Sequence, residues 1–520
     1  MSKKSVAITI DCQKPFIKHL DDEHIGKNNA LFTAISNTYL PMLNVFADLE
    51  AEGIPFKVNM VISPTLCDML ADPVLQQQYI EWLDKIISLG NEEVEKYTKD
   101  SEKRHLAVET LNKAVQDKRD FQEVLNQDIL SKFAYYARKG NIEFLGTTAT
   151  SVFLPHYSDI EEVVSAQIET GLQLHKKYFG LAPEGFYLPY LAYYPGLEFI
   201  LRSYGFSYTV LDTHGLLFAD PQPANGIFTP ARCYNSLAVF GADNEDIQKY
   251  KTNPLYKNLE KDIGFEADSD YLANHLGTEL KERVTTGYAY YQADGKTLYN
   301  IAAAKEQVAN DAKDFIDSKI KRLSKAQELI QDQDVSLVCT IDGDTLGVNW
   351  KEGISWLEEV LRQAFYNNEI EIEFLSDLIR DNHFSLQKIK PYFSSEEGTG
   401  YGENMLENSN GWMLRYIRKA SERMIDLTSR FTDDTGLKAR ALNLAAKEIL
   451  LAQSGDWQQM INTKSNPEYA EQRFKESVLA FSTVYESLGS NSISTEWLTR
   501  MEKKHTIFPE INYMVFRSKQ

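Results

Sequence analysis

Short apolar runs, rich in β-branched and aromatic residues, alternate with helical stretches over roughly the first 390 residues of this 520-residue chain. Such runs are typical of buried strands, and a 3.6-residue spacing of apolar residues between them indicates amphipathic helices. The predicted strands are residues 6–10, 56–62, 141–150, 186–188, 207–211, 237–241, 334–341 and 369–374. Strands that alternate with helices form parallel sheets through right-handed crossovers, so the pattern predicts an α/β fold.

Polar residues follow several of these strands where each run ends: Asp11, residues 147–151, Tyr190, Asp212 with His214, and Asp342. Both a closed barrel and an open doubly wound sheet bind their ligands at the carboxyl ends of parallel strands. The position of these residues therefore predicts a site at that edge, and it leaves the choice between the two folds open.

The chain divides into regions of different character. Residues 1–395 form the predicted α/β domain, with a charged helical insertion at about 74–139 and an irregular, tyrosine-rich insertion at about 244–300. Residues 396–520 are predicted to be a helical domain. Ser158 and Glu161 have capping-box spacing, so a helix is expected to begin there and to end at Gly180.

Composition excludes several classes of function. The net charge of −20 argues against nucleic acid and anionic membranes as partners, because both require a basic surface. Four separated cysteines without a CxxC pair indicate a reducing, cytoplasmic protein without structural zinc. No apolar run suffices for a signal peptide or a spanning helix, and no P-loop, GxGxxG after a strand or GxSxG is present. No cofactor is expected, and the oligomeric state is not predicted.

Three polar residues are candidates for chemistry, each with a structural alternative. Asp342 follows a buried strand and has Asp344 nearby to perturb its pKa, although an aspartate at a strand end often caps its own turn. Asp11 is placed where a metal ligand could lie, but no histidine pair has HxxxH or HExxH spacing, so a structural role is favoured. His214 suits either the orientation of a substrate hydroxyl or a loop contact.

Several ordered segments resemble glycoside hydrolase family 57, in particular its α-1,4-glucan branching enzyme branch. They are residues 11–19 (DCQKPFIKH), 38–43 (TYLPML), 62–66 (ISPTL), 149–155 (ATSVFLP), 185–196 (GFYLPYLAYYPG), 211–216 (LDTHGL), 341–353 (IDGDTLGVNWKEG) and 454–458 (SGDWQ). The resemblance implies a distorted (β/α)7 barrel with a C-terminal helical domain, and an α-glucan or oligosaccharide as the ligand.

The departures from the family pattern fall on its chemistry. The resemblance places Asp342 at the general-acid position and Tyr190 at the position of the nucleophilic glutamate. Asp11, Gln13 and Ser151 stand where the family has histidines, and Val348 and Asn349 replace a histidine and a tryptophan. A retaining glycosidase needs a carboxylate about 5–5.5 Å from its acid. A tyrosine, with a pKa near 10, is a poor nucleophile without a base.

The residues expected to bind the substrate are partly aromatic and partly polar. They are Asp11, Gln13, Ser151, Tyr187, Tyr193, His214, Trp350, Asp456 and Trp457. The expected function is that of a catalytically impaired homologue that binds glucan. One alternative is an active branching enzyme, amylase or transglycosylase that pairs Asp342 with Tyr190 or with a relocated carboxylate such as Asp11. The other is a non-catalytic regulatory or interaction protein. A deacetylase-like metal enzyme is weaker, since its histidine ligands are missing.

Overall fold

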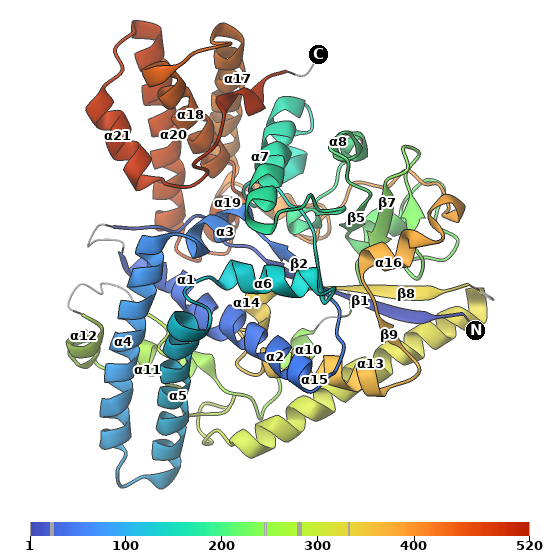
Figure 1. The fold of residues 1–520 in the computed structure, drawn as a ribbon, viewed down its shortest axis with the longest axis vertical. Helices are drawn as coiled ribbons and strands as arrows, with labels where there is room; N and C mark the ends of the chain where they lie inside the picture. Colours follow the sequence, from blue (N-terminus) through green and yellow to red (C-terminus); the bar gives the residue numbers. More distant parts are fainter. Residues whose placement is uncertain are drawn as a thin grey trace.

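Seven parallel strands form the centre of the molecule (Figure 1). The computed structural model describes residues 2–20, 25–243, 245, 247–277, 283–330 and 333–518. The strands are β1 (Lys4–Cys12), β2 (Val58–Ile62), β3 (Ile142–Phe144), β4 (Gly185–Tyr187), β5 (Tyr208–Leu211), β7 (Ala238–Gly241) and β8 (Val335–Asp342). Their order is β3-β2-β1-β8 in one sheet and β4-β5-β7 in the other.

Two parallel bridges close these sheets into a barrel. Gly146 pairs with Phe186 beside β3 and β4, and Ala242 pairs with Val338 beside β7 and β8. The predicted (β/α)7 barrel is confirmed, and the open doubly wound alternative is wrong. Two further strands lie outside the seven: β6 (Ala231–Arg232) is antiparallel to β7, and β9 (Glu371–Ile372) pairs with the beginning of β1.

The third predicted strand is shorter than expected. Residues 141–150 were predicted to be extended throughout, but β3 ends at Phe144. Leu145 and Gly146 still bond to neighbouring strands, but farther along the backbone bonds to a helix: Ala149 donates to the carbonyl of Gln167 (2.8 Å), and the Thr150 N–H donates to the Gln167 side chain (3.1 Å). These contacts direct the segment after β3 toward the carboxyl-end face of the barrel.

Helices surround the barrel on the outside. They include α1 (Asn29–Ala34), α2 (Leu40–Ala51), α3 (Pro64–Leu70), α6 (Ile129–Arg138), α7 (Glu161–Phe179), α8 (Leu197–Ser203), α9 (Thr213–Leu217), α13 (Ile301–Ile330), α14 (Gly343–Leu346), α15 (Gly353–Tyr366) and α16 (Leu375–Arg380). Helix α7 ends at Gly180 in the left-handed conformation, as predicted. The predicted capping box is wrong, because Ile160 is the N-cap residue and no side chain caps the helix.

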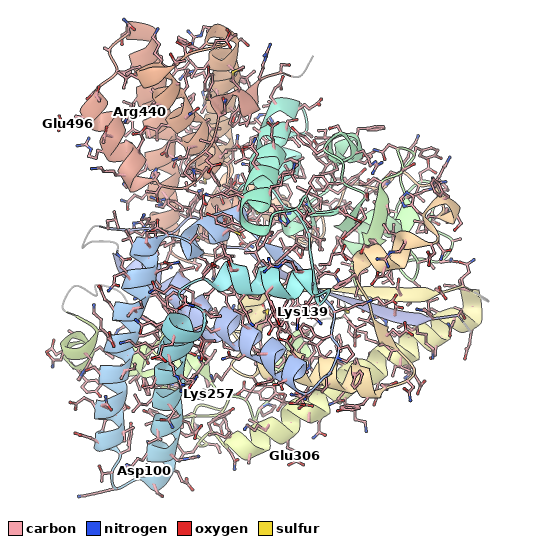
Figure 2. The ribbon with its side chains drawn as sticks, in the orientation of Figure 1. Asp100, Lys139, Lys257, Glu306, Arg440 and Glu496 are labelled. Carbon is pink, nitrogen blue, oxygen red and sulfur yellow. The ribbon has the colours of Figure 1, made fainter. Side chains whose placement is uncertain are left out.

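Two long helices, α4 (Pro73–Lys96) and α5 (Ser101–Arg119), form an antiparallel pair that projects from the barrel (Figure 1). Asp100 caps α5 at the tip of this pair (Figure 2). The tyrosine-rich segment contributes the short helices α10 (Gln248–Lys251), α11 (Ile263–Glu266) and α12 (Ser269–Leu276). Leu272 of α12 belongs to the same apolar cluster as Leu89 of α4, so the two insertions pack on each other.

The C-terminal region is helical and lies beside the carboxyl-end face of the barrel (Figure 1). Its helices are α17 (Gly411–Arg430), α18 (Gly436–Ala452), α19 (Gly455–Asn462), α20 (Pro467–Ser490) and α21 (Thr495–Lys504). The beginning of α19 reaches the barrel: Ser454 pairs with Val152, and the N–H of Gly455 donates to the Ser151 carbonyl (2.7 Å). Within the part of the chain that the structure describes, no helix is both long and apolar enough to cross a bilayer.

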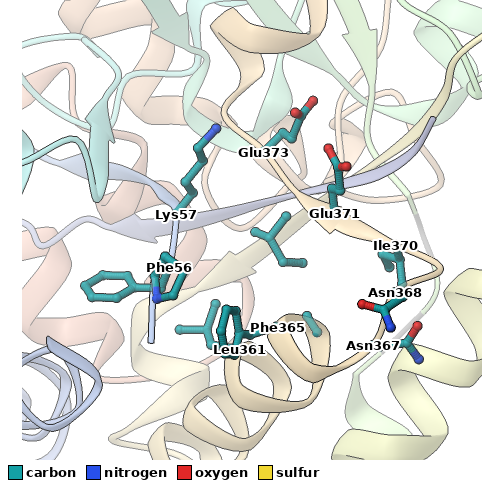
Figure 3. A pocket seen from close by; sticks show the side chains of 12 residues that line it. Phe56, Lys57, Leu361, Phe365, Asn367, Asn368, Ile370, Glu371 and Glu373 are labelled. Atoms are coloured by element: carbon teal, nitrogen blue, oxygen red, sulfur yellow. The ribbon is translucent and has the colours of Figure 1, made fainter. Parts of the chain in front are cut away.

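A cavity of about 420 Å³ lies at the opposite, amino-end side of the barrel (Figure 3). Phe56, Leu361 and Phe365 form its apolar wall, and Lys57, Glu371 and Glu373 supply charged side chains. Glu371 is paired with Lys3 (3.1 Å), and Lys57 is paired with Asp377 (2.6 Å). Because β9 pairs with the beginning of β1, this cavity is separated from the strand ends that carry the predicted site.

Candidate functional site

Two aspartates lie side by side at the carboxyl ends of β1 and β8. Asp11 and Asp342 are partners in the parallel register of these strands. The Asp342 carboxylate caps α14 by accepting the Thr345 N–H (2.7 Å), and solvent reaches its side chain. The surrounding protein and the nearby charge of Asp344 raise the pKa of Asp342, and Lys14 opposes this shift. Lys14 is itself buried and paired with Asp344. The functional and capping roles proposed for Asp342 are thus compatible.

A hydrogen-bonded chain links β1 to the segment after β3. The Gln13 amide donates to Asp11 (2.7 Å), and the Ser151 hydroxyl donates to Gln13 (3.0 Å). Burial raises the pKa of Asp11, and its Oδ1 has no hydrogen-bond partner among the described residues. The burial disfavours the ionised form that a nucleophilic carboxylate requires. The structure brings together the three residues that the resemblance places where the family has histidines.

Asp456, from the C-terminal helical region, adds a carboxyl group beside Ser151. It lies in the first turn of α19 and accepts a hydrogen bond from Ser454 (2.5 Å). Burial raises its pKa to about 6, although Ser454, Ser151 and Lys14 favour the ionised form. The site is consequently built from both the barrel and the helical region.

Tyr190 occupies a strained position after β4. Its backbone is left-handed (φ 60°, ψ 18°), which is uncommon for a residue other than glycine. The ring packs against Phe153 and Met405, and the hydroxyl is buried without a hydrogen-bond partner. Burial raises the pKa of Tyr190 well above its ordinary value, and the nearby carboxylates, with Asp456 first, raise it further. Among the residues that the structure describes, no base lies within hydrogen-bonding distance of this phenol to activate it.

Glu396 belongs to the same site, and the sequence reasoning missed it. Its N–H donates to the carbonyl of Tyr190 (2.9 Å), and solvent reaches its side chain. The surrounding protein and the charges of Glu397, Asp342 and Asp212 raise its pKa to about 8. The only signal in the sequence was a pair of adjacent glutamates in a glycine-rich loop, which is usually a solvated turn.

Tyr187 and His214 lie around these carboxyl groups. Tyr187 lines the barrel interior. Its pKa is raised mainly by burial and further by the nearby carboxyl groups of Asp11, Glu396 and Asp342, so its phenol stays protonated. His214 contacts Asp212 through Nδ1 (2.6 Å), while its Nε2 has no hydrogen-bond partner among the described residues. The loop around Gly400 packs against the His214 ring.

Four predicted aromatic contacts require correction. Tyr187, Tyr193, Trp350 and Trp457 are at most 2% exposed and so present no surface to a ligand. The Tyr193 hydroxyl donates to Glu198 (2.6 Å), and the Trp457 indole donates to the Leu451 carbonyl (2.8 Å). Trp350 packs between the rings of Tyr256 and Trp356. All four are core residues. The sequence does not show this, because aromatic crowding does not distinguish packing from stacking on a sugar.

The polar side chains at the site carry carboxyl groups, hydroxyls, an amide and the His214 imidazole. Among the residues that the structure describes, no group of three or more histidine, cysteine, aspartate or glutamate side chains is arranged to hold a metal ion. The groups present suit hydrogen bonds to the hydroxyls of a neutral, polyhydroxylated ligand.

Comparisons with known proteins agree with this geometry. Residues 11–391 match the family model described as glycosyl hydrolase family 57. The chain belongs to glycosyl hydrolase family 57. Residues 416–516 match the C-terminal domain described for 1,4-alpha-glucan branching enzymes. This family 57 chain is also 25% identical to a 1,4-alpha-glucan branching enzyme of Thermococcus kodakarensis over 479 residues, which are 85% of this chain and 68% of the relative.

Solved structures of family 57 proteins have the same fold. The alpha-amylase AmyC of Thermotoga maritima superimposes with a TM-score of 0.91 at 29% identity, with 100% of both chains covered. The branching enzyme of Thermococcus kodakarensis, solved in complex with glucose and additives, gives a TM-score of 0.85 at 21% identity, with 99% of this chain and 97% of that one covered. The family 57 chain described here therefore shares the fold of both structures over at least 99% of its length.

Proposed function

We propose that this family 57 protein binds α-glucan at the carboxyl-end face of its barrel and is impaired in the family's covalent chemistry. The observation that carries the proposal is the Tyr190 phenol, which is buried without a partner at the position where the resemblance puts the nucleophile. Its raised pKa keeps it neutral at pH 7. Without a carboxylate at this position, no glycosyl-enzyme forms by the usual retaining route.

The rest of the site supports glucan as the ligand. Gln13, Ser151 and His214 offer hydrogen-bonding groups beside Asp342, and sugar hydroxyls both donate and accept such bonds. The relatives named above act on alpha-glucans, and the match extends over the barrel and the helical region. Branching transfers a glucan segment from a glycosyl-enzyme, so the loss of that intermediate removes branching while leaving binding in place.

Two measurements on the purified protein test this proposal. Affinity electrophoresis in glycogen gels should show retardation that soluble maltooligosaccharide relieves. Incubation with amylose should leave the iodine colour and the branch content unchanged at enzyme concentrations where an active family 57 branching enzyme alters both. Branching at a rate comparable with that enzyme, or the absence of any retardation, would refute the proposal.

The Tyr190→Phe variant separates this proposal from a tyrosine-nucleophile mechanism. Phenylalanine keeps the ring contacts with Phe153 and Met405 and removes only the hydroxyl. We expect unchanged retardation in glycogen gels and unchanged action on glucan. A loss of action by more than about 100-fold would identify the phenol as a participant in the reaction.

A further inference from the structure

Four aromatic side chains form a continuous row at the carboxyl-end face of the barrel. The His214 ring lies 5.2 Å from the ring of Tyr401 and 6.3 Å from the ring of Phe218, measured between ring centroids. The Phe218 ring in turn lies 6.3 Å from the ring of Tyr392. We call these four residues the aromatic row. Because His214 is already part of the candidate site, one end of the row lies at that site.

Solvent reaches most of the aromatic row. Phe218 is 59% exposed, Tyr392 is 47% exposed and Tyr401 is 48% exposed, whereas His214 is partly buried. Single exposed apolar side chains are common on protein surfaces and need no explanation. Several that lie next to one another form a contiguous patch, and such patches mark surfaces that bind a ligand or a partner.

Two segments that are distant in sequence hold the row together. Helix α9 and the residue that follows it carry two of the rings, and the segment that leaves the barrel after α16 carries the other two. The Tyr392 N–H donates to the Gly215 carbonyl (2.9 Å). Asp220 and Lys390 exchange two backbone hydrogen bonds (3.0 and 2.8 Å). The neighbouring positions of Phe218 and Tyr392 are therefore fixed by backbone contacts.

The glycine-rich loop places Tyr401 over His214. Gly400 has a left-handed backbone (φ 104°), and a Cβ atom there would lie 2.7 Å from the His214 ring. The Ser395 N–H donates to the Gly400 carbonyl (2.9 Å) and closes the loop. Any other residue at position 400 would be strained and would push the loop away from His214. The close approach of the Tyr401 ring to the site thus depends on this glycine.

The chemistry of the row fits a neutral sugar chain. Aromatic faces pack against the C–H groups of a sugar ring, and the phenols and the imidazole add hydrogen-bonding groups for its hydroxyls. The net charge of −20 disfavours an anionic occupant. Because the row continues from His214, a ligand that leaves the site on this side meets Phe218 and Tyr392 next.

We propose that the aromatic row is an outer binding surface for the α-glucan chain, occupied by glucose units beyond those that the carboxyl groups of the site contact. This inference rests on the proposed function, namely that the site binds α-glucan. It adds that the affinity rises with chain length, and it assigns that rise to Phe218 and Tyr392.

Isothermal titration calorimetry with maltotriose and maltoheptaose tests the assignment. The wild-type protein should bind maltoheptaose more tightly than maltotriose. Phe218→Ala and Tyr392→Ala should each lower the affinity for maltoheptaose by roughly fivefold or more, as is typical for truncation of a ring that a ligand covers. Both variants should keep the wild-type affinity for maltotriose, because the groups of the inner site remain.

Two further variants are matched controls. Tyr392→Phe keeps the ring and removes only the hydroxyl, so it should retain most of the affinity that Tyr392→Ala loses. Tyr366→Ala removes a ring that is 71% exposed at the end of α15, outside the row, and should leave the affinity for both sugars unchanged. Circular dichroism of each variant should match that of the wild type.

The possible outcomes separate this inference from the proposed function. Equal wild-type affinities for the two sugars, unchanged maltoheptaose affinity in Phe218→Ala and Tyr392→Ala, or an equal loss for both sugars would overturn the outer surface. Size-exclusion chromatography tests another occupant: a wild-type dimer that becomes monomeric in Phe218→Ala would show that a second copy covers the row and would also overturn it. A protein that binds neither sugar would refute the proposed function itself.

Discussion

At the scale of single residues, backbone contacts hold Tyr190 in place independently of its side chain. Tyr190 has a left-handed conformation next to Pro189, and its carbonyl receives two hydrogen bonds from the segment that carries Glu396. A substitution that changes only the side chain at residue 190 should therefore leave this part of the fold intact. The Tyr190 hydroxyl is buried and forms no hydrogen bond with the residues that the structure describes.

The stability of Tyr190→Phe follows from this unsatisfied hydroxyl. A buried polar group without a partner costs about 1–3 kcal/mol, so its removal should raise the free energy of unfolding by about 1 kcal/mol. Urea unfolding followed by circular dichroism measures the difference. Tyr193→Phe is the matched comparison: that hydroxyl donates to Glu198, and the variant should lose about 1 kcal/mol while keeping its affinity for glycogen. A destabilised Tyr190→Phe or an unchanged Tyr193→Phe would contradict the hydrogen bonding described for these two phenols.

At the scale of secondary-structure elements, α7 and β3 pack through a buried histidine. His175 of α7 lies against Phe144 and Phe179, and burial lowers its pKa from 6.5 to about 4. The folded state holds this imidazole neutral, so the unfolded chain binds the additional proton between these two pH values. The stability that it supplies is complete above pH 6.5 and is lost as the pH falls toward 4.

We therefore expect His175→Phe to weaken the acid sensitivity of the fold. Between pH 7.5 and pH 5 the wild-type free energy of unfolding should fall by about 2 kcal/mol more than that of the variant. Denaturant titrations of both proteins at the two pH values give the comparison. The same pH dependence in both proteins would show that His175 is protonated in the folded state.

The secondary-structure elements show which features of the structure are determined by residues close together in the sequence. Strand positions and the end of α7 at Gly180 were predictable because apolar periodicity and glycine conformation act over a few residues. The end of the strand before residue 150 was not predictable, since Ala149 and Thr150 bond to Gln167 of α7. Glu396 was missed for the same reason on a larger scale: Ser395 and Tyr190 are 205 residues apart in sequence, and only the closed barrel brings them together.

At the scale of the whole molecule, the barrel and the C-terminal helical region share the site. Ser454 pairs with Val152, Asp456 lies near Ser151, and Gly455 packs against the Tyr190 ring. The sequence could predict the positions of Asp11 and Asp342 but not the burial that raises the pKa of both, because that burial depends on groups from several elements. The resemblance pointed to most residues of the site, whereas Glu396 is recognised only from the loop contacts that bring it beside Tyr190.

Gly455→Ala tests whether this junction positions Tyr190. A methyl group at residue 455 would lie within 3 Å of the Tyr190 ring and of the Met405 side chain, so these side chains or α19 would have to shift. We expect a loss of about 1–3 kcal/mol in the free energy of unfolding, as for other overpacked interiors, together with weaker retardation in glycogen gels. The same substitution in a Tyr190→Ala background should cost less, because the clashing ring is gone. Additive effects of the two substitutions would show that residues 190 and 455 are not coupled across the junction.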